Sequence, residues 1–190
     1  MLSSIHPLGE RARSNRWPVT FGAFALGAML AGATLGGTVA FVGDRVRFSS
    51  TSALVPAVVI GAAALADLFR WPVPTPHRQV NERWIGTYRG WVYGLGFGMQ
   101  LGVGFATYLV TWAIPALVLV LAWIGDPVVG LWVGALFGLG RTLPLAAAGW
   151  INRPDRLTSF NRAVASLAQP AQFVAAILLL TLAAIGGLAA

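Results

Sequence analysis

Residues 103–124, VGFATYLVTWAIPALVLVLAWI, form a run of 22 residues that contains no charged side chain. A helix rises about 1.5 Å per residue, so this run covers about 33 Å, enough for the ~30 Å hydrocarbon core of a bilayer. Similar apolar stretches occur at 18–42, 52–70, 127–150 and 168–189. The chain is therefore predicted to be all-α, a polytopic transmembrane helical bundle in which residues 1–190 form a single transmembrane domain.

Composition supports a membrane protein. Hydrophobic residues make up 57% of the chain and charged residues only 10%, whereas soluble domains carry about 25% charged residues. The apolar run at 18–42 is longer than the roughly 7–15 residues of a signal-peptide core, so we expect it to be an uncleaved first span.

The basic residues indicate a lipid partner. The net charge of +7 comes from thirteen arginines and no lysine. These arginines lie mostly in loops beside the apolar spans, where such residues set topology and contact anionic lipid head groups. We therefore expect the lipid bilayer and its anionic head groups as partners, and no nucleic acid. Other membrane protein subunits are a further candidate partner.

Residues that carry chemistry are scarce. The chain has no cysteine, and His6 and His77 both lie outside the predicted spans. Thiol chemistry is excluded, and we expect no metal and no cofactor. No catalytic set is recognisable in the sequence, so we expect that the protein is not an enzyme.

The segment from 89 to 125 decides the number of crossings. It is too long for one simple crossing and short for two. If it crosses once, the arginines of three segments all lie on the same side of the membrane, as the positive-inside rule requires. These segments are the residues before 17, 70–89 and 150–167. We therefore predict five spans, with the N-terminus cytoplasmic and the C-terminus outside the plasma membrane of a bacterium; six spans are the alternative.

A surplus of residues remains at 90–102, GWVYGLGFGMQLG. It either extends a long tilted third helix or forms a glycine-broken half-helix, and we favour the first. Backbone left unpaired at membrane depth is stable only against protein or water, so a broken helix here would mark a site. The preceding segment, 79–91, is predicted to continue as an interfacial helix.

An internal repeat is suggested by a shift of 71 residues. This shift aligns Pro56 with Pro127 and Arg70 with Arg141, with the same spacing of fourteen from proline to arginine in both copies. The predicted halves are 18–88 and 89–159, followed by the last span at 160–190. Parallel repeats of this kind occur in one class of transporters.

Glycines recur at intervals of four. Such rows permit close approach of helix backbones, which drives helix association in lipid. The predicted helix-packing positions are Gly32, Gly36, Gly94, Gly98, Gly102, Gly130, Gly134 and Gly138.

A second set of residues gives the candidate binding site. On a continuous third helix Gly96, Gln100, Gly104, Thr107 and Thr111 would share one face. This face would either line a polar path or form hydrogen bonds between helices, and we favour the hydrogen bonds.

Two charged residues complete that candidate site. Arg141 lies inside a predicted span, and Asp67 is the only acidic residue inside one. They either pair with each other, or Arg141 reaches the head groups while Asp67 pairs with Arg70. The candidate binding residues are therefore Gln100, Thr107, Thr111, Asp67 and Arg141.

The stretch from about 94 to 145 resembles two helices of the cytochrome c biogenesis and thiol-disulfide transmembrane electron carriers. The matching pieces are Gly-Phe-Gly at 96–98 and GALFGLGRTLPL at 134–145. The resemblance implies a carrier-like fold around a central site. The two membrane cysteines that carry that family's chemistry are absent here, so no functional residue is carried over.

Two functions follow from these observations. The leading interpretation is a transport-related role without thiol chemistry, which the repeat, the polar face and Arg141 favour. The alternative is a non-catalytic accessory or structural subunit of a larger membrane complex, which the glycine rows and the lack of site residues favour.

Overall fold

The computed structural model describes residues 5–46, 54–74, 83–105, 109–151 and 153–188. All regular secondary structure in these ranges is helical. The helices are α1 (Pro7–Ala12), α2 (Trp17–Val46), α3 (Leu54–Leu68), α4 (Arg83–Thr87), α5 (Gly90–Gly102), α6 (Ala113–Ile124), α7 (Pro127–Gly140), α8 (Leu143–Ala148) and α9 (Pro154–Leu188).

Three helical stretches in the described residues are long and apolar enough to cross a membrane. They are Trp17–Val46, Pro127–Ala148 and Asp155–Leu188. This is fewer than the five spans predicted. Helix α3 has 15 residues and α6 has 12, about 22 Å and 18 Å of helix, so neither alone matches the ~30 Å core.

Helix α2 is the central element, and it packs against α5, α6 and α7. Glycines permit these contacts. A Cβ atom on Gly32 would clash with the carbonyl oxygen of Gly134, and one on Gly36 with that of Gly130. Residue numbers rise along α2 as they fall along α7, so these two helices are antiparallel.

Helices α2 and α5 run in parallel. Gly94 lies against the backbone of Thr20, Gly98 against that of Phe24, and Gly102 against that of Ala28. Further along α2, Gly43 lies against the backbone of Ala122 near the end of α6. Helices α5 and α6 together therefore follow α2 along most of its length.

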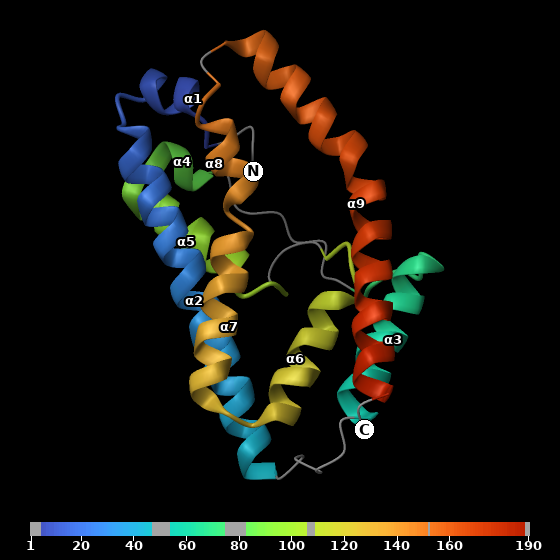
Figure 1. The fold of residues 1–190 in the computed structure, drawn as a ribbon. Helices are drawn as coiled ribbons and strands as arrows, with labels where there is room; N and C mark the ends of the chain where they lie inside the picture. Colours follow the sequence, from blue (N-terminus) through green and yellow to red (C-terminus); the bar gives the residue numbers. More distant parts are fainter. Residues whose placement is uncertain (1–4, 47–53, 75–82, 106–108, 152, 189–190) are drawn as a thin grey trace.

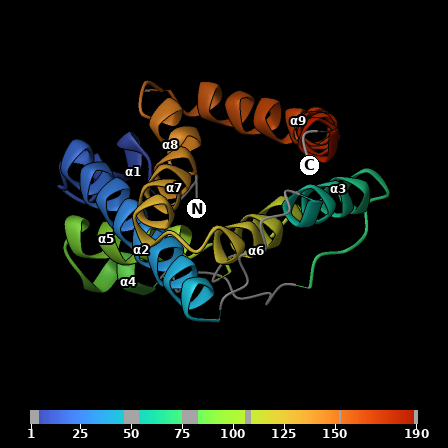
Figure 2. The same cartoon turned by 60° about the horizontal axis from the view of Figure 1, so that its bottom comes forward.

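A second group of helices lies to one side. Helix α9 packs along α3, and α6 contacts both α2 and α3, so α6 joins the two groups (Figure 1). Gly61 lies near Ala183 and Gly186 near Ala57, which makes α3 and α9 antiparallel. Seen from the end of the bundle, α6 lies between α2 and α3 (Figure 2).

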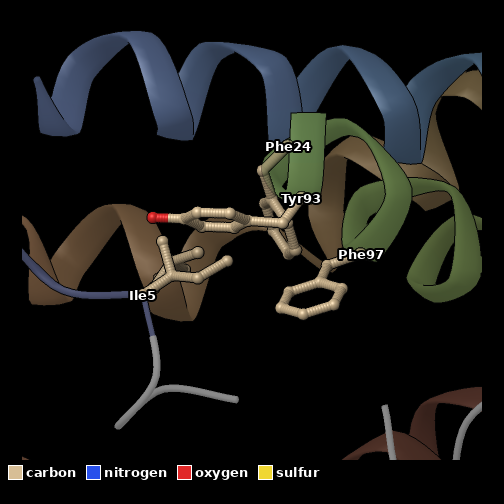
Figure 3. Packing of buried hydrophobic residues seen from close by; sticks show 5 residues of the cluster. Ile5, Phe24, Tyr93 and Phe97 are labelled. Atoms are coloured by element: carbon tan, nitrogen blue, oxygen red, sulfur yellow. The ribbon is translucent and has the colours of Figure 1, made fainter. Parts of the chain in front are cut away.

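The N-terminal segment folds back onto the bundle. Helix α1 begins with Pro7, and the His6 Nδ1 atom accepts the Gly9 N–H at 3.1 Å, which caps the helix. Ile5 is 1% exposed and packs in a cluster with Phe24, Tyr93, Phe97 and Leu145. Figure 3 shows Ile5 close to the Tyr93 ring.

Of the interfacial helix predicted at 79–91, the structure describes 83–91, where α4 ends at Thr87 and α5 begins at Gly90. Trp84 of α4 stacks on Phe97 of α5 with ring centroids 6.1 Å apart. The repeat remains a prediction. Helix α2 is continuous, whereas the stretch aligned with it is divided between α5 and α6.

Candidate functional site

The third predicted crossing is broken in its middle. Helix α5 ends at Gly102, and α6 begins only at Ala113. Gly104 has φ +77°, a left-handed conformation that favours glycine and ends the helix. Two helix ends meet here, so backbone N–H and C=O groups lose their helical partners. Polar side chains from three other elements supply new partners.

Arg141 satisfies the carboxyl end of α5. This residue directly follows α7, and its Nη1 atom donates to the carbonyl oxygen of Leu101 at 2.9 Å. The guanidinium also lies over the Phe137 ring, 5.6 Å from the centroid. A cation at this position is favourable because a helix carries partial negative charge at its carboxyl end.

Asp67 satisfies the amino end of α6. From the last turn of α3, its carboxylate accepts the Trp112 backbone N–H at 2.7 Å and the Thr111 hydroxyl at 2.5 Å. The Thr111 Oγ1 atom in turn accepts the Ala113 N–H at 3.0 Å. The carboxylate also faces the partial positive charge at the amino end of the helix.

Two further bonds fix the segment between the half-helices. The Gln172 side chain on α9 donates to the Val110 carbonyl oxygen at 2.7 Å. The Trp112 indole N–H donates to the Trp71 carbonyl oxygen at 3.0 Å. The break is thus held by α3, α9 and the end of α7 together.

The structure brings some of the candidate binding residues together and separates others. Asp67 and Thr111 are bonded to each other, whereas Arg141 binds the other side of the break. Gln100 is half-buried on α5, and Thr107 lies outside the described residues. The single polar face predicted for Gly96 to Thr111 is wrong, because the helix ends at Gly102.

The alternative ion pair between Asp67 and Arg141 is not formed. Within the described ranges, the salt bridge present is Arg13–Glu10, at 2.7 Å. Asp67 lies where α3 meets α6, while Arg141 follows a helix that packs on α2. The two charges therefore act on opposite ends of the broken helix.

The eight glycines predicted as packing positions lie at helix contacts. In each case a Cβ atom would meet the backbone of a neighbouring helix within 2.5 Å, so close approach depends on glycine at these places. The positions are Gly32, Gly36, Gly94, Gly98, Gly102, Gly130, Gly134 and Gly138.

A buried network around Glu10 was not predicted. Glu10 is 0% exposed, and its carboxylate accepts from the Tyr93 hydroxyl at 2.5 Å, from Thr20 Oγ1 at 2.9 Å and from Arg13 Nη2 at 2.7 Å. Asn15 donates to the Tyr93 hydroxyl at 3.1 Å. The network ties the N-terminal segment to α2 and α5.

Sequence signals for the missed residues are weak but present. Proline in the first turn and an acidic residue three positions before Arg13 are typical of a short helix that begins at Pro7. Gln172 is a polar residue inside the predicted span 168–189. Neither signal states which partner the side chain meets.

A cavity of about 250 Å³ lies beside the break. Asp67 and Arg70 come from the end of α3, Val110 from the break, and Gln169 and Gln172 from α9. The cavity contains opposite charges and amides but, among its described lining residues, no nucleophile with an adjacent base. Its chemistry fits recognition of a polar group.

These features define the class of the protein. Over the described residues the chain is all-helical, and some of its helices are long and apolar enough to cross a membrane. One helix is broken, and polar side chains from other helices cap the two ends at the break. Known proteins resemble it in sequence. It is 32% identical over 153 residues to the methylamine utilization protein MauF of Paracoccus denitrificans, covering 76% of this chain and 54% of the relative. The MauF proteins of Paracoccus versutus and Methylobacillus flagellatus are 33% and 29% identical, again over 76% of this chain.

The chain spans about half the length of the curated relatives it matches. No family profile and no solved structure matches the sequence. The resemblance to the cytochrome c biogenesis and thiol-disulfide carriers is wrong, because the relatives are MauF proteins over three quarters of the chain. The glycine-rich pieces that suggested it, 96–98 and 134–145, serve helix packing, which many membrane proteins share.

Proposed function

We propose that this chain is a non-catalytic accessory protein of a bacterial plasma membrane, and that it works with other membrane proteins in methylamine utilisation. Support for the process comes from the similarity to MauF proteins over 76% of the chain. Since those relatives are bacterial, a bacterial membrane is the expected location.

One observation carries the accessory role. Asp67, Arg141 and Gln172 each form hydrogen bonds with backbone or side-chain groups at the broken helix. They satisfy the protein's own polar groups rather than form a continuous polar path. The similarity to MauF lends transport no support, and neither the sequence nor the cavity suggests an enzyme.

The proposed topology has five crossings. Helices α5 and α6 together make the third, because they run in the same direction as α2 and reach from Thr20 to Gly43 along it. That distance is about 35 Å of helix, enough for one crossing. Helix α3, with flanking residues, makes the second crossing, and α7 with α8 and then α9 make the last two.

Orientation follows from the arginines. Three lie before residue 17, three in 78–89 and three in 150–167, all on the N-terminal side of this topology, while Arg70 lines the cavity beside the break. That side is the cytoplasm, where these residues meet anionic lipid head groups, and the C-terminus lies outside. The bundle is one domain, with 18–88 and 89–159 as proposed repeat halves.

The experiment is native purification in a mild detergent followed by mass spectrometry. We expect a membrane protein at a fixed stoichiometry with this chain. In parallel, deletion of the gene should impair growth on methylamine but not on ammonium. An isolated monomer or homodimer together with normal growth on methylamine would contradict the proposal.

A further inference from the structure

A second cavity, of about 360 Å³, lies at the end of the bundle where α2 and α5 begin, and we call it the arginine cavity. Figure 1 shows α1, the start of α2 and α4 together at this end. Asn15, Arg16 and Thr20 line the cavity at the start of α2, and Arg89 and Trp91 line it at the start of α5. Among its described lining residues none is acidic, so the cavity carries a net positive charge.

The two arginines of this cavity are available to a ligand. Both residues are exposed, and neither guanidinium forms a hydrogen bond or an ion pair with the residues that the structure describes. Arg89 is the N-cap residue of α5, and its side chain makes no capping bond. Because α2 and α5 both begin beside the cavity, the partial positive charge at two helix amino ends adds to the charge of the guanidinium groups. The cavity therefore favours an anion.

The buried network around Glu10 holds one wall of the arginine cavity in place. Asn15 donates to the Tyr93 hydroxyl at 3.1 Å, and the Thr20 hydroxyl donates to the Glu10 carboxylate at 2.9 Å. Glu10 is 0% exposed and pairs with Arg13 at 2.7 Å, so its negative charge is neutralised within the protein. The wall is thus fixed before a ligand binds, which lowers the entropic cost of binding.

The arginine cavity lies at the depth of the lipid head groups in the proposed topology. Helix α2 crosses the hydrocarbon core within the ~35 Å between Thr20 and Gly43, and Arg16 lies about 6 Å further out along its axis. Arg89 lies five residues before Gly94, which packs against Thr20, so Arg89 is at a similar depth. The head-group region extends about 5–7 Å beyond the hydrocarbon core on each side, which is where both arginines lie.

We propose that the arginine cavity binds the phosphate of one anionic phospholipid from the surrounding leaflet. Arg16 and Arg89 donate to the phosphate oxygens, and arginine–phosphate bonds belong to the strong, charge-assisted class. Trp91 and Val19 also line the cavity and are each about half exposed, so they give the lipid an apolar contact beside its phosphate. The site rests on the proposed topology and gives the expected contact with anionic head groups a defined place. It is independent of the role in methylamine utilisation.

The charges of the cavity select an anionic head group over a zwitterionic one. Phosphatidylglycerol presents a phosphate and no cation. Phosphatidylethanolamine presents the same phosphate with an ammonium group, which would lie beside two guanidinium groups and meet no carboxylate among the described lining residues. Like charges at this range repel, so phosphatidylethanolamine binds more weakly.

The test uses the full chain, purified in a mild detergent, stripped of lipid and titrated separately with the two phospholipids under native mass spectrometry. We expect one phosphatidylglycerol to bind about tenfold more tightly than phosphatidylethanolamine. Equal binding of the two lipids would overturn the proposal.

A competition distinguishes a lipid from a soluble anion, because inorganic phosphate offers the same oxygens to the arginines. Inorganic phosphate in large excess should leave phosphatidylglycerol bound, since it lacks the apolar contact. Displacement of the lipid by inorganic phosphate would overturn the assignment to a phospholipid.

Two variants assign the contacts. Arg16→Gln and Arg89→Gln each remove one guanidinium from an exposed position, so the lipid-free protein should keep its thermal stability. Each should bind phosphatidylglycerol about tenfold more weakly, as expected for the loss of one charge-assisted bond. The double variant should bind phosphatidylglycerol no better than phosphatidylethanolamine.

The control is Arg156→Gln. Arg156 is an exposed arginine of α9, lies on the same side of the membrane in the proposed topology, and does not line the cavity. This variant loses the same charge and should bind phosphatidylglycerol as the parent does. Unchanged affinity in the double variant, or an equal loss in Arg156→Gln, would overturn the proposal.

Failure of this site and failure of the proposed topology give different results. Detergent solution has no sidedness, so the lipid affinities do not depend on the number or direction of the crossings. An error in the topology would appear in the labelling of single cysteines in intact membranes, whatever the lipid affinities are.

Discussion

Gly134 and Gly32 face each other where α7 crosses α2, and neither position has room for a methyl group. Lipid supplies no hydrophobic force between helices, so close backbone contact has to stabilise this interface. Gly22, also on α2, has no neighbouring atom within 4 Å of the place that a Cβ atom would occupy. One helix thus contains glycines that packing requires and a glycine that it does not.

The substitution of alanine at Gly134 and at Gly22 separates these two cases. Gly134→Ala should lower the free energy of unfolding by about 1–3 kcal/mol, because the new methyl group meets a backbone carbonyl. Gly22→Ala should leave stability unchanged or raise it by up to about 1 kcal/mol, because alanine favours the helix. Thermal unfolding in one detergent compares them, and equal effects would show that the glycine contacts are not needed.

His6 makes the N-terminal segment sensitive to pH. Burial, and then the nearby Arg13, lower the pKa of His6 below its ordinary 6.5. The folded state therefore prefers neutral His6, whose Nδ1 caps α1, and the unfolded state binds more protons. This contribution is present above pH about 6.5 and is lost as the pH falls below it.

We expect the parent to lose stability between about pH 7.5 and about pH 5.5 more steeply than His6→Asn, which keeps a capping acceptor that does not titrate. Thermal unfolding across this pH range measures the difference. Parallel pH profiles would show that His6 does not contribute.

Sequence reasoning at this scale could find the packing glycines, because spacing by four is a property of one helix. It could not find Glu10. The partners of this carboxylate, Thr20 and Tyr93, lie 10 and 83 residues away, and no local pattern records a contact at such separation. From its neighbours alone, Glu10 would be expected to remain in solvent beside Arg13.

The broken helix α5–α6 is the element that distinguishes this bundle. Its first half is the glycine-rich GWVYGLGFGMQLG, which packs well on α2 but favours helix poorly. The apolar second half cannot hydrogen-bond the freed backbone itself. Asp67, Arg141 and Gln172 therefore stabilise the break from three other elements.

Substitutions at Asp67 and Arg141 test these caps. Asp67→Ala should cost about 1–2 kcal/mol because α6 loses its cap, whereas Asp67→Asn should cost less. Arg141→Ala should cost about 1–3 kcal/mol because the Leu101 carbonyl loses a partner. The double alanine variant should lose close to the sum, since the two residues share no partner.

If the double alanine variant lost less unfolding free energy than Arg141→Ala alone, Asp67 and Arg141 would form an ion pair. That result would contradict the separate caps described above. The unfolding free energies of the parent, the two single alanine variants and the double variant, measured under one condition, decide between these outcomes.

Part of this element was predictable. The apolar length indicated one crossing with a surplus, and the glycines allowed a broken helix as an alternative to a long tilted one. Hydropathy does not show where such a helix breaks, because Gly104 and the residues around it are as apolar as the helix itself. The position of the break depends on which side chains can cap it, and those belong to α3, α9 and the end of α7.

At the scale of the whole molecule, α2 with α5 and α7 forms one tightly packed group, while α3 with α9 forms a second (Figure 1). Helix α6 joins them at the break. Large hydrophobic side chains remain exposed on α7 and α9, for example Trp132 at 68% and Leu182 at 59%. In a membrane these surfaces meet lipid or other proteins, in keeping with the proposed accessory role.

The orientation of α5 and α6 tests most directly whether these two helices form one broken crossing. The chain has no cysteine, so single cysteines can be placed before α5 by Tyr88→Cys and after α6 by Asp126→Cys, with Arg11→Cys as the reference for the N-terminal side. A membrane-impermeant maleimide should label positions 11 and 88 from one face and position 126 from the other. If positions 88 and 126 were labelled from the same face, α5 and α6 would enter and leave on one side, and a single broken crossing would be contradicted.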